Sequence, residues 1–217
     1  MSSPRYDYII LGGGAAGLSL LLRLIDSGKF QHKKILLIDQ DRKERNDRTW
    51  CYWEKGSGYF DALLQQEWAA LDFLSPAFSS TLQLQGYRYK MIRGLDFYGY
   101  ARDRIRRQPN IEWKFTRVLG TRTEGKGKVR ILLEGEELDA GDALLFNSIY
   151  PAEAPLKGEL RLLQHFKGYW IRTDRPCFDP SRATLMDFRV AQSHGTSFAY
   201  VLPLAPDRAL VEYTLFT

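Results

Sequence analysis

Residues 8–39 read YIILGGGAAGLSLLLRLIDSGKFQHKKILLID, and this stretch predicts a complete βαβ unit. The apolar run at 8–11 predicts a buried strand, and 35–38 predicts a second one. Between them the leucines from Leu18 onward recur at helical spacing, and Gly28 closes the helix. A GxGxxG pattern alone is a weak signal. Here the strand, the helix, the second strand and the terminal acid Asp39 all stand in the order of a dinucleotide-binding fold.

Each glycine of the loop has its own task in such a fold. Gly12 permits a tight turn, Gly14 lets a pyrophosphate approach the backbone, and Gly17 lets the helix pack closely on the strands. The helix N-terminus then binds the negatively charged phosphates. Asp39 is placed to accept a hydrogen bond from an adenosine ribose hydroxyl. A glycine-rich turn in an unrelated α/β domain is the alternative, but it explains neither Gly17 nor Asp39. The pattern does not separate NAD from FAD, although its position ahead of all other chain is typical of flavoproteins.

Length and composition indicate an ordinary soluble protein. The 217 residues suffice for one large or two small domains, and 44% of them are hydrophobic and 26% charged. No apolar run approaches the roughly 18 residues that cross a bilayer, and residues 1–5 are too short and polar for a signal peptide. We therefore expect a cytoplasmic protein.

The net charge of +5 has three interpretations. The excess is concentrated at Arg102, Arg104, Arg106 and Arg107 on one predicted helix and at Lys126, Lys128 and Arg130 near a turn. These side chains can form a solvated face, contact an anionic membrane surface, or bind nucleic acid. Nucleic acid is the least favoured partner because no recognised binding motif accompanies the charge.

The cysteines and histidines predict no metal site. Cys51 and Cys177 are far apart and form no CxxC motif, and the three histidines lack ligand spacing. Two cysteines also suit a reducing compartment without structural disulfides.

The order of patterns predicts two domains. Residues 1–160 are predicted to form a Rossmann-like α/β domain, with helices at 61–74 and 95–108 and a small antiparallel β insert before a return strand at 142–148. Residues 161–217 are predicted to form a mainly antiparallel β domain that covers a substrate and is incomplete here. Its four strands are expected at 168–173, 183–188, 197–204 and 208–214.

Four short motifs resemble those of the lycopene β-cyclase family, and the resemblance extends over the whole chain. They are DRTW at 47–50, TLMD at 184–187, YVLPL at 200–204 and LVEYT at 210–214. Members of that family are FAD-dependent enzymes of carotenoid synthesis whose fold is similar to that of the flavin hydroxylases. Because family members are longer, we expect this chain to be an N-terminal portion that lacks a further flavin-binding Gly-Asp motif and C-terminal helices.

The resemblance implies a redox-neutral cyclisation, catalysed by an intramolecular lyase or isomerase. A proton adds to the terminal double bond of lycopene, the neighbouring double bond closes on the cation, and a second proton leaves. The resemblance also implies FAD in its reduced form, with NADPH as the electron donor. Lycopene is insoluble in water, so we expect the enzyme to work peripherally at a membrane surface, where the basic patches meet anionic lipid.

Glu212 is the first candidate for the acid or base. It lies late in an apolar strand, where burial raises a carboxyl pKa, although the solvent face of an edge strand is the alternative. Many relatives carry two consecutive acids here, and this chain has Glu212-Tyr213. Asp187 is the second candidate, with a strand-end cap as its alternative. Arg48 is expected to contact flavin phosphate or ribose, unless it is a solvated loop arginine.

Several aromatic side chains can offer ring faces to a cation, although plain core positions are the more common use of such residues. They are Trp50, Tyr52, Trp53, Trp170 and Tyr200. Two other functions stay open: another flavoprotein of the same fold, such as a hydroxylase or isoprenoid reductase, and an inactive nucleotide-binding fragment.

Overall fold

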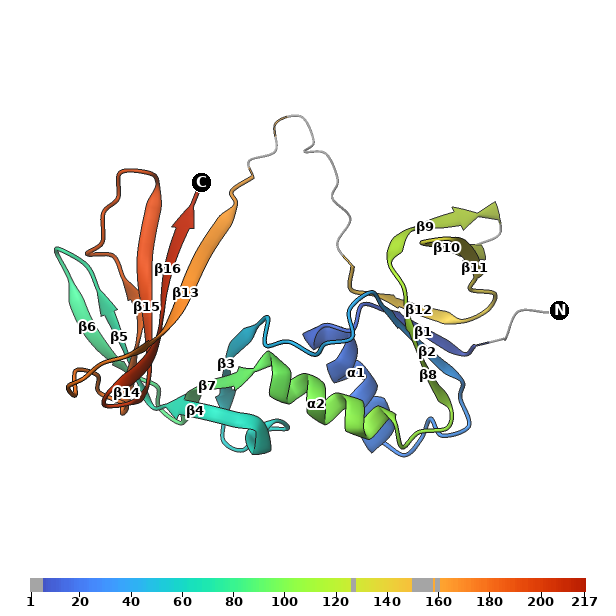
Figure 1. Cartoon of the computed structure of the whole chain (residues 1–217), viewed down its shortest axis with the longest axis horizontal. Helices are drawn as coiled ribbons and strands as arrows, with labels where there is room; N and C mark the ends of the chain where they lie inside the picture. Colours follow the sequence, from blue (N-terminus) through green and yellow to red (C-terminus); the bar gives the residue numbers. More distant parts are fainter. Residues whose placement is uncertain (1–5, 126–127, 150–157, 159–160) are drawn as a thin grey trace. The chain divides into compact units, whose positions relative to one another are not determined.

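The computed structural model describes residues 6–125, 128–149, 158 and 161–217, and the chain forms two compact units (Figure 1). The first unit combines Met1–Asp47 with Gly94–Ala154, and the second combines Arg48–Arg93 with Pro155–Thr217. The sequence pattern predicted a division after residue 160. In the structure, residues 48–93 group with the C-terminal residues instead.

The first unit is built on a four-stranded sheet in the order β12-β1-β2-β8. Its strands are β1 (Tyr8–Leu11), β2 (Ile35–Asp39), β8 (Ile111–Phe115) and β12 (Leu144–Asn147). Every neighbouring pair runs parallel, and α1 (Ala15–Asp26) connects β1 to β2. The predicted βαβ unit and the return strand are therefore confirmed.

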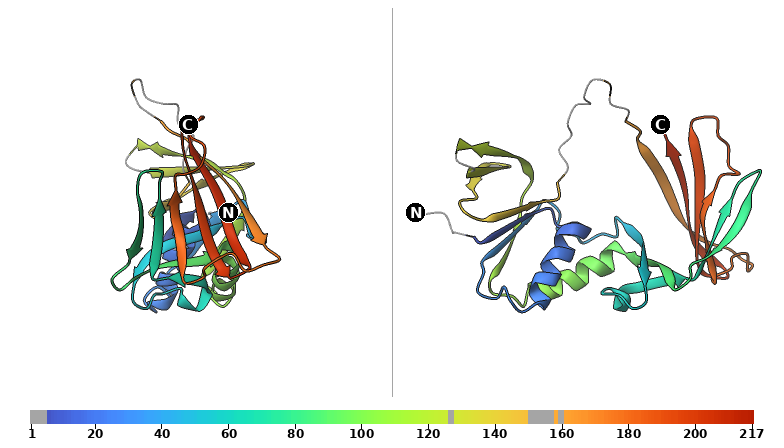
Figure 2. Two further views of the ribbon diagram at one scale, coloured as in Figure 1. Left: turned by 90° about the vertical axis from the view of Figure 1, so that its left-hand side faces the viewer. Right: turned by 180° about the vertical axis from the view of Figure 1, so that it is seen from behind.

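Two layers cover this sheet (Figures 1 and 2). One face carries α1 and α2 (Gly94–Ile105), and the other carries the antiparallel strands β9 (Val118–Glu124), β10 (Lys128–Leu133) and β11 (Glu136–Asp139). The helix predicted at 95–108 thus forms, and the predicted β insert forms as well. The central strands β1 and β2 are covered on both sides, which explains why their sequences are continuous apolar runs.

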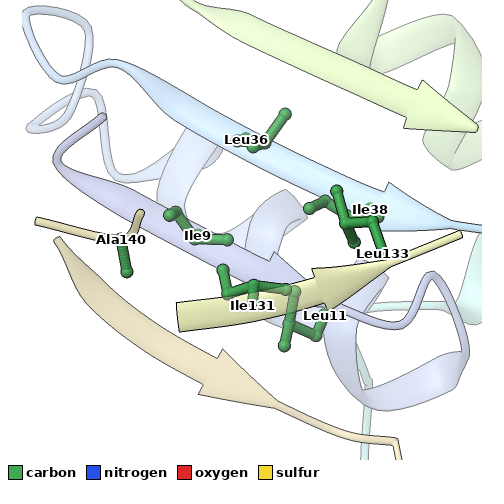
Figure 3. Packing of buried hydrophobic residues seen from close by; sticks show 7 residues of the cluster. All are labelled: Ile9, Leu11, Leu36, Ile38, Ile131, Leu133 and Ala140. Carbon is green, nitrogen blue, oxygen red and sulfur yellow. The ribbon is translucent and has the colours of Figure 1, made fainter. Parts of the chain in front are cut away.

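Alternation along β1 and β2 divides their side chains between the two faces. Four of them turn toward β10 and pack on its apolar residues (Figure 3). The buried residues of this cluster are Ile9, Leu11, Leu36, Ile38, Ile131, Leu133 and Ala140. Each fully buried leucine or isoleucine contributes roughly 1.5–3 kcal/mol, so this layer fixes the strand ends that hold the glycine loop.

The second unit holds a six-stranded sheet in the order β13-β16-β15-β14-β5-β6. Its strands are β13 (Gln164–Arg172), β16 (Arg208–Phe216), β15 (Thr196–Ala205), β14 (Arg182–Asp187), β5 (Ala70–Leu74) and β6 (Ser79–Gln83). Only β14 and β5 pair in parallel, so the expectation of a mainly antiparallel sheet with four C-terminal strands is confirmed.

A three-stranded antiparallel sheet completes this unit, in the order β3-β7-β4. It consists of β3 (Thr49–Lys55), β4 (Leu64–Trp68) and β7 (Tyr87–Arg93), and the short 3-10 helix η1 (Asp61–Leu63) precedes β4. Trp68, Tyr89 and Met91 of this sheet share one buried cluster with Leu202 and Leu210 of the larger sheet.

The helix predicted at 61–74 is wrong. Only Asp61–Leu63 is helical, and the rest forms β4 and β5. Leu64 and Trp68 alternate with the exposed Gln65 and Glu67, which is the period of a half-buried strand. Two short strands in sequence can mimic helical spacing, and pairing with β7 and β14 decides between the two interpretations.

Candidate active site

The glycine loop has the geometry of a phosphate cradle. Gly12 has φ +98°, which a residue with a side chain rarely adopts. A Cβ atom at Gly17 would collide with the carbonyl oxygen of Gly12 and lie 3.2 Å from Cγ2 of Ile10. By contrast, a Cβ at Gly14 would meet no atom within 4 Å. Gly12 and Gly17 therefore shape the turn, and Gly14 leaves open space in front of it.

The start of α1 suits a bound anion. Gly14 is the N-cap residue, so no side chain caps the helix, and its first turn contains no acidic residue. The amide groups and the positive end of the helix dipole therefore face the open space at Gly14 without a competing carboxylate. The cradle fits the pyrophosphate of a dinucleotide.

Asp39 stands beside this cradle, at the end of β2. One carboxylate oxygen accepts a hydrogen bond of 2.6 Å from the amide of Gly13. The other accepts one of 2.7 Å from the amide of Asp41 and lies 3.4 Å from Nζ of Lys43. The carboxylate thus ties the glycine loop to β2, and its remaining lone pairs are the ones that a ribose hydroxyl would use.

The loop after β2 is tied to the first unit at several points. Arg42 stacks over the ring of Phe115, with its guanidinium carbon 4.8 Å from the ring centre. The hydroxyl of Tyr98 donates a hydrogen bond of 3.0 Å to Asp47. Arg48 comes next, is exposed, and opens the second unit. Its contact with flavin stays a prediction.

Glu212 lies in the middle of β16 and is half-buried. It pairs with Tyr200 on β15, and directly paired residues of antiparallel strands share a face. Cys51 and Tyr89, from the smaller sheet, also interact electrostatically with its carboxylate. Burial raises the pKa of Glu212 above its ordinary value. A carboxyl in this setting holds its proton to a higher pH than one in water.

The groups around Glu212 are uncharged at neutral pH. Burial raises the pKa of Cys51 to about 12, and it raises the pKa of Tyr89 and Tyr200 as well. Cys51 and Tyr89 are also hydrogen-bonded to each other. Sequence reasoning missed both residues, since only the pairing of β3 with β7 brings them together.

Asp187 is placed differently. It pairs with Ala199, which pairs in turn with Tyr213, so Asp187 lies on the opposite face of the sheet from Glu212. Its carboxylate forms two hydrogen bonds of 2.9 and 2.8 Å with the guanidinium of Arg189. These bonds hold the pKa of Asp187 below its usual range. The structure does not bring the two candidate acids together.

The aromatic candidates divide between faces too. Tyr200 and Trp170 share the face of Glu212, since Trp170 pairs with Leu210 two residues away. Trp53 contacts Tyr89, with ring centres 5.0 Å apart. Trp50 and Tyr52 alternate with Cys51 along β3 and so point away from it.

The basic clusters are partly neutralised within the first unit. Arg104 pairs with Asp26, and Arg130 lies 3.4 Å from Glu124. Arg102 donates to the carbonyl oxygen of Lys43 at 2.6 Å. Lys126 lies outside the described residues. Across the part of the chain that the structure describes, no three His, Cys, Asp or Glu side chains gather in a way that would hold a metal ion.

Solved structures with the same fold include flavin-dependent enzymes. A flavin-dependent brominase, Bmp2, superposes with a TM-score of 0.64 at 14% identity, covering 98% of this chain and 56% of that one. A geranylgeranyl bacteriochlorophyll reductase-like protein of Thermoplasma acidophilum gives 0.63 at 16%, covering 97% and 56%. The probable FAD-dependent monooxygenase pqsL of Pseudomonas aeruginosa gives 0.60 at 14%, covering 98% and 61%. The chain thus has the mixed α/β fold of FAD-dependent monooxygenases and halogenases.

The family is narrower than the fold. Residues 7–217 match the profile of the family described as lycopene cyclase protein, and the chain belongs to that family. The lycopene beta-cyclase of Paracoccus sp. (strain N81106 / MBIC 01143) is 27% identical over 221 residues, which cover 98% of this chain. The match covers 52% of the Paracoccus protein, so the chain spans about half the length of this curated relative.

Proposed function

We propose that this chain forms the dinucleotide-binding unit and part of the active site of an FAD-dependent lycopene cyclase that closes lycopene ends into β-rings. One observation supports the proposal most: within a member of the lycopene cyclase family, Glu212 is a half-buried carboxyl surrounded by uncharged groups. Such a carboxyl can deliver a proton to a double bond, which is a poor base.

Glu212 then acts as the acid of a redox-neutral step. Its proton adds to the terminal double bond of lycopene, the neighbouring double bond closes the ring on the resulting cation, and a proton leaves the ring to a base. Burial raises the pKa of Glu212, which favours the protonated acid, and it strengthens the attraction between the carboxylate and the cation. In this proposal Asp187 is a second candidate for proton transfer, although its pairing with Arg189 favours a structural role.

The surroundings of Glu212 suit a transient cation. Tyr200 and Trp170 lie on the same sheet face as Glu212, and their rings can offer π-electron density to positive charge. Cys51 and Tyr89 keep the neighbouring space free of charge. A cation formed here would have the Glu212 carboxylate and two aromatic rings within the same sheet face.

FAD is assigned to the first unit. Gly12, Gly14 and Gly17 would cradle its pyrophosphate and Asp39 its adenosine ribose, while Arg48 is proposed for a flavin phosphate or ribose. The fold is that of FAD-dependent enzymes, which supports this choice over NAD. Reduced flavin would supply electron-rich or acid-base assistance without net oxidation, with NADPH as the electron donor.

The location follows from the substrate. Lycopene is apolar, so we propose that the protein is cytoplasmic and takes lycopene from a membrane to which it binds peripherally. Among the described helices, none combines the length and apolarity needed to span a bilayer. Exposed arginines such as Arg106 and Arg107 are candidates for contact with anionic lipid.

The test is conversion of lycopene by purified protein with chemically reduced flavin. Cyclic product should form without consumption of oxygen, and Glu212→Gln should lower the rate at least 100-fold with flavin content unchanged. Asp187→Asn tests the second candidate on the other face of the same sheet, and it should lower the rate less than Glu212→Gln does, because Asp187 is paired with Arg189. Normal turnover in Glu212→Gln would remove Glu212 from the mechanism.

A second function is favoured by the same fold. The neighbours include a probable monooxygenase and a reductase-like protein, so a hydroxylase or isoprenoid reductase is the alternative. Consumption of oxygen or NADPH in proportion to product would favour it, because cyclisation consumes neither. Purified protein that folds but binds no flavin would indicate an inactive nucleotide-binding fragment.

A further inference from the structure

Gly168 is the residue of β13 that pairs directly with Glu212 of β16. Paired residues of antiparallel strands share a face, so any side chain at position 168 would lie against that of Glu212. Glycine weakens a strand because it packs nothing and loses more entropy on folding. Its use at the centre of a nine-residue strand therefore calls for a local reason.

The reason is visible in the space that Glu212 occupies. A Cβ atom at Gly168 would lie 2.8 Å from Cγ and 3.0 Å from Oε1 of Glu212, well inside normal contact distances. The next nearest atom, Cδ1 of Leu210, would be 3.3 Å away. The Glu212 side chain thus lies across β13, in the place where an alanine methyl would be.

The glycine of β9 shows no such contact. Gly120 is half-buried, and a Cβ atom there would meet nothing within 4 Å. Gly168 also has no positive φ angle, so its backbone does not require glycine. The close approach to Glu212 is what distinguishes it.

We propose that Gly168 is a positioning residue for Glu212: its missing side chain leaves the space in which the carboxyl lies across β13, in the row formed by Phe166 and Trp170. These two aromatic residues stand two positions to either side of Gly168 on the same face, and both are exposed. The inference rests on the proposed role of Glu212 and adds the residue that sets where its proton is delivered.

The surroundings determine where a displaced carboxyl would go. Three titratable groups face Glu212: Cys51 from β3, Tyr89 from β7 and Tyr200 from β15. His165 and Lys167 of β13 alternate with Gly168 and so lie on the other face. Cys51, Tyr89 and Tyr200 are half-buried or buried, whereas nearly all residues of β13 are exposed. A methyl group at position 168 therefore moves the carboxyl toward water.

The experiment compares Gly168→Ala with Gly120→Ala in the full chain. Both changes put alanine for glycine in a strand, so neither should lower the midpoint of thermal unfolding. The titration of Glu212 is followed by NMR of its carboxyl carbon, assigned with Glu212→Gln, and lycopene turnover is measured in the flavin-loaded enzyme. Gly168→Ala should lower the pKa of Glu212 by at least half a unit and turnover at least tenfold, and Gly120→Ala should change neither.

The outcomes separate this inference from the proposed function. An unchanged Glu212 titration in Gly168→Ala would overturn the positioning role, whatever the enzyme does with lycopene. A lowered pKa without any cyclisation in the unsubstituted protein would keep the positioning role and reject the cyclase proposal. A large loss of thermal stability in Gly168→Ala alone would show that β13 resists the methyl instead of Glu212, and would also overturn it.

Discussion

The amide of Gly13 donates a 2.6 Å hydrogen bond to the carboxylate of Asp39, which links the glycine loop to the end of β2. The bond joins two parts of the proposed FAD site that the chain separates by α1. Because Asp39 is nine-tenths buried, its charge is held close to the loop and screened little by water. The same carboxylate therefore shapes the loop and presents acceptors to a ribose.

Asp39→Ala should weaken flavin binding by about 10- to 100-fold, since charge-assisted hydrogen bonds contribute roughly 1.5–3 kcal/mol each. The dissociation constant can be measured by flavin fluorescence. Asp41→Ala is the matched control, because the exposed Asp41 carboxylate accepts a hydrogen bond from Lys43 and none from the glycine loop. Equal losses in the two variants would contradict a direct role of Asp39.

Gly14→Ala and Gly17→Ala should fail in different ways. A methyl group at Gly14 meets only open space, so the fold should keep its stability while flavin binding falls at least tenfold. A methyl group at Gly17 collides with the carbonyl of Gly12, so the free energy of unfolding should fall by about 2 kcal/mol and binding should fall with it. Urea unfolding and flavin titration of both variants test this. A stable Gly14→Ala protein with normal affinity would refute the cradle.

The raised pKa of Glu212 predicts a particular pH dependence of stability. Between the ordinary pKa of glutamate, about 4.3, and the raised folded value, the native state binds more protons than the unfolded state. The free energy of unfolding therefore decreases as pH rises through this window. Glu212→Gln should remove that decrease, so it should stabilise the protein relative to the unsubstituted chain at pH 8, with no such gain at pH 4.

Urea unfolding from pH 4 to 9 measures this difference. Glu134→Gln, at an exposed glutamate of the first unit, serves as the control and should give curves parallel to those of the unsubstituted protein. A gain in Glu212→Gln that is the same at every pH would mean that packing, and not desolvation of the carboxylate, is responsible.

Local pattern was enough to predict much of this fold. Residues 8–39 and the strand at 197–204 carry their periodicity in the chain itself, and both form as predicted. The prediction of a helix at 61–74 was wrong because two short strands have the same spacing of apolar residues. Only pairing with the distant strands β7 and β14 distinguishes strands from a helix here. Propensity is overruled where pairing with remote strands is available.

The site was less accessible from the sequence. Glu212 was identified by its place in an apolar strand, but its neighbour Cys51 comes from the other end of the second unit and has no local signal. Asp187 fails to join Glu212 because the register of β14 and β15 shifts between Thr184 and Asp187. A one-residue shift moves side chains to the other face, and no pattern in residues 182–187 announces it.

Loss of the Lys90 side chain should destabilise the second unit strongly, although lysine is usually a surface residue. Its side chain is only 1% exposed, and Nζ donates to Glu54 at 2.9 Å, Asp61 at 2.5 Å and the carbonyl of Gly56 at 3.0 Å. Burial lowers the pKa of Lys90, but the two carboxylates outweigh it and raise the pKa to about 12, so the ion pairs persist throughout the neutral range. Lys90→Ala should lower the free energy of unfolding by about 3 kcal/mol, because it leaves two carboxylates without their shared cation and opens a gap.

The neighbouring, exposed Lys55 provides the control, and Lys55→Ala should change the free energy of unfolding by less than about 0.5 kcal/mol. The pKa of Asp61 is lowered by its hydrogen bond to Lys90, so the contribution of this pair is present at neutral pH and is lost as pH falls through that lowered pKa. The difference between Lys90→Ala and the unsubstituted protein should therefore shrink at acid pH. Urea unfolding at pH 7 and pH 3 measures it, and a difference of equal size at both pH values would mean that packing of the lysine stem, and not its charge, stabilises β7 against η1.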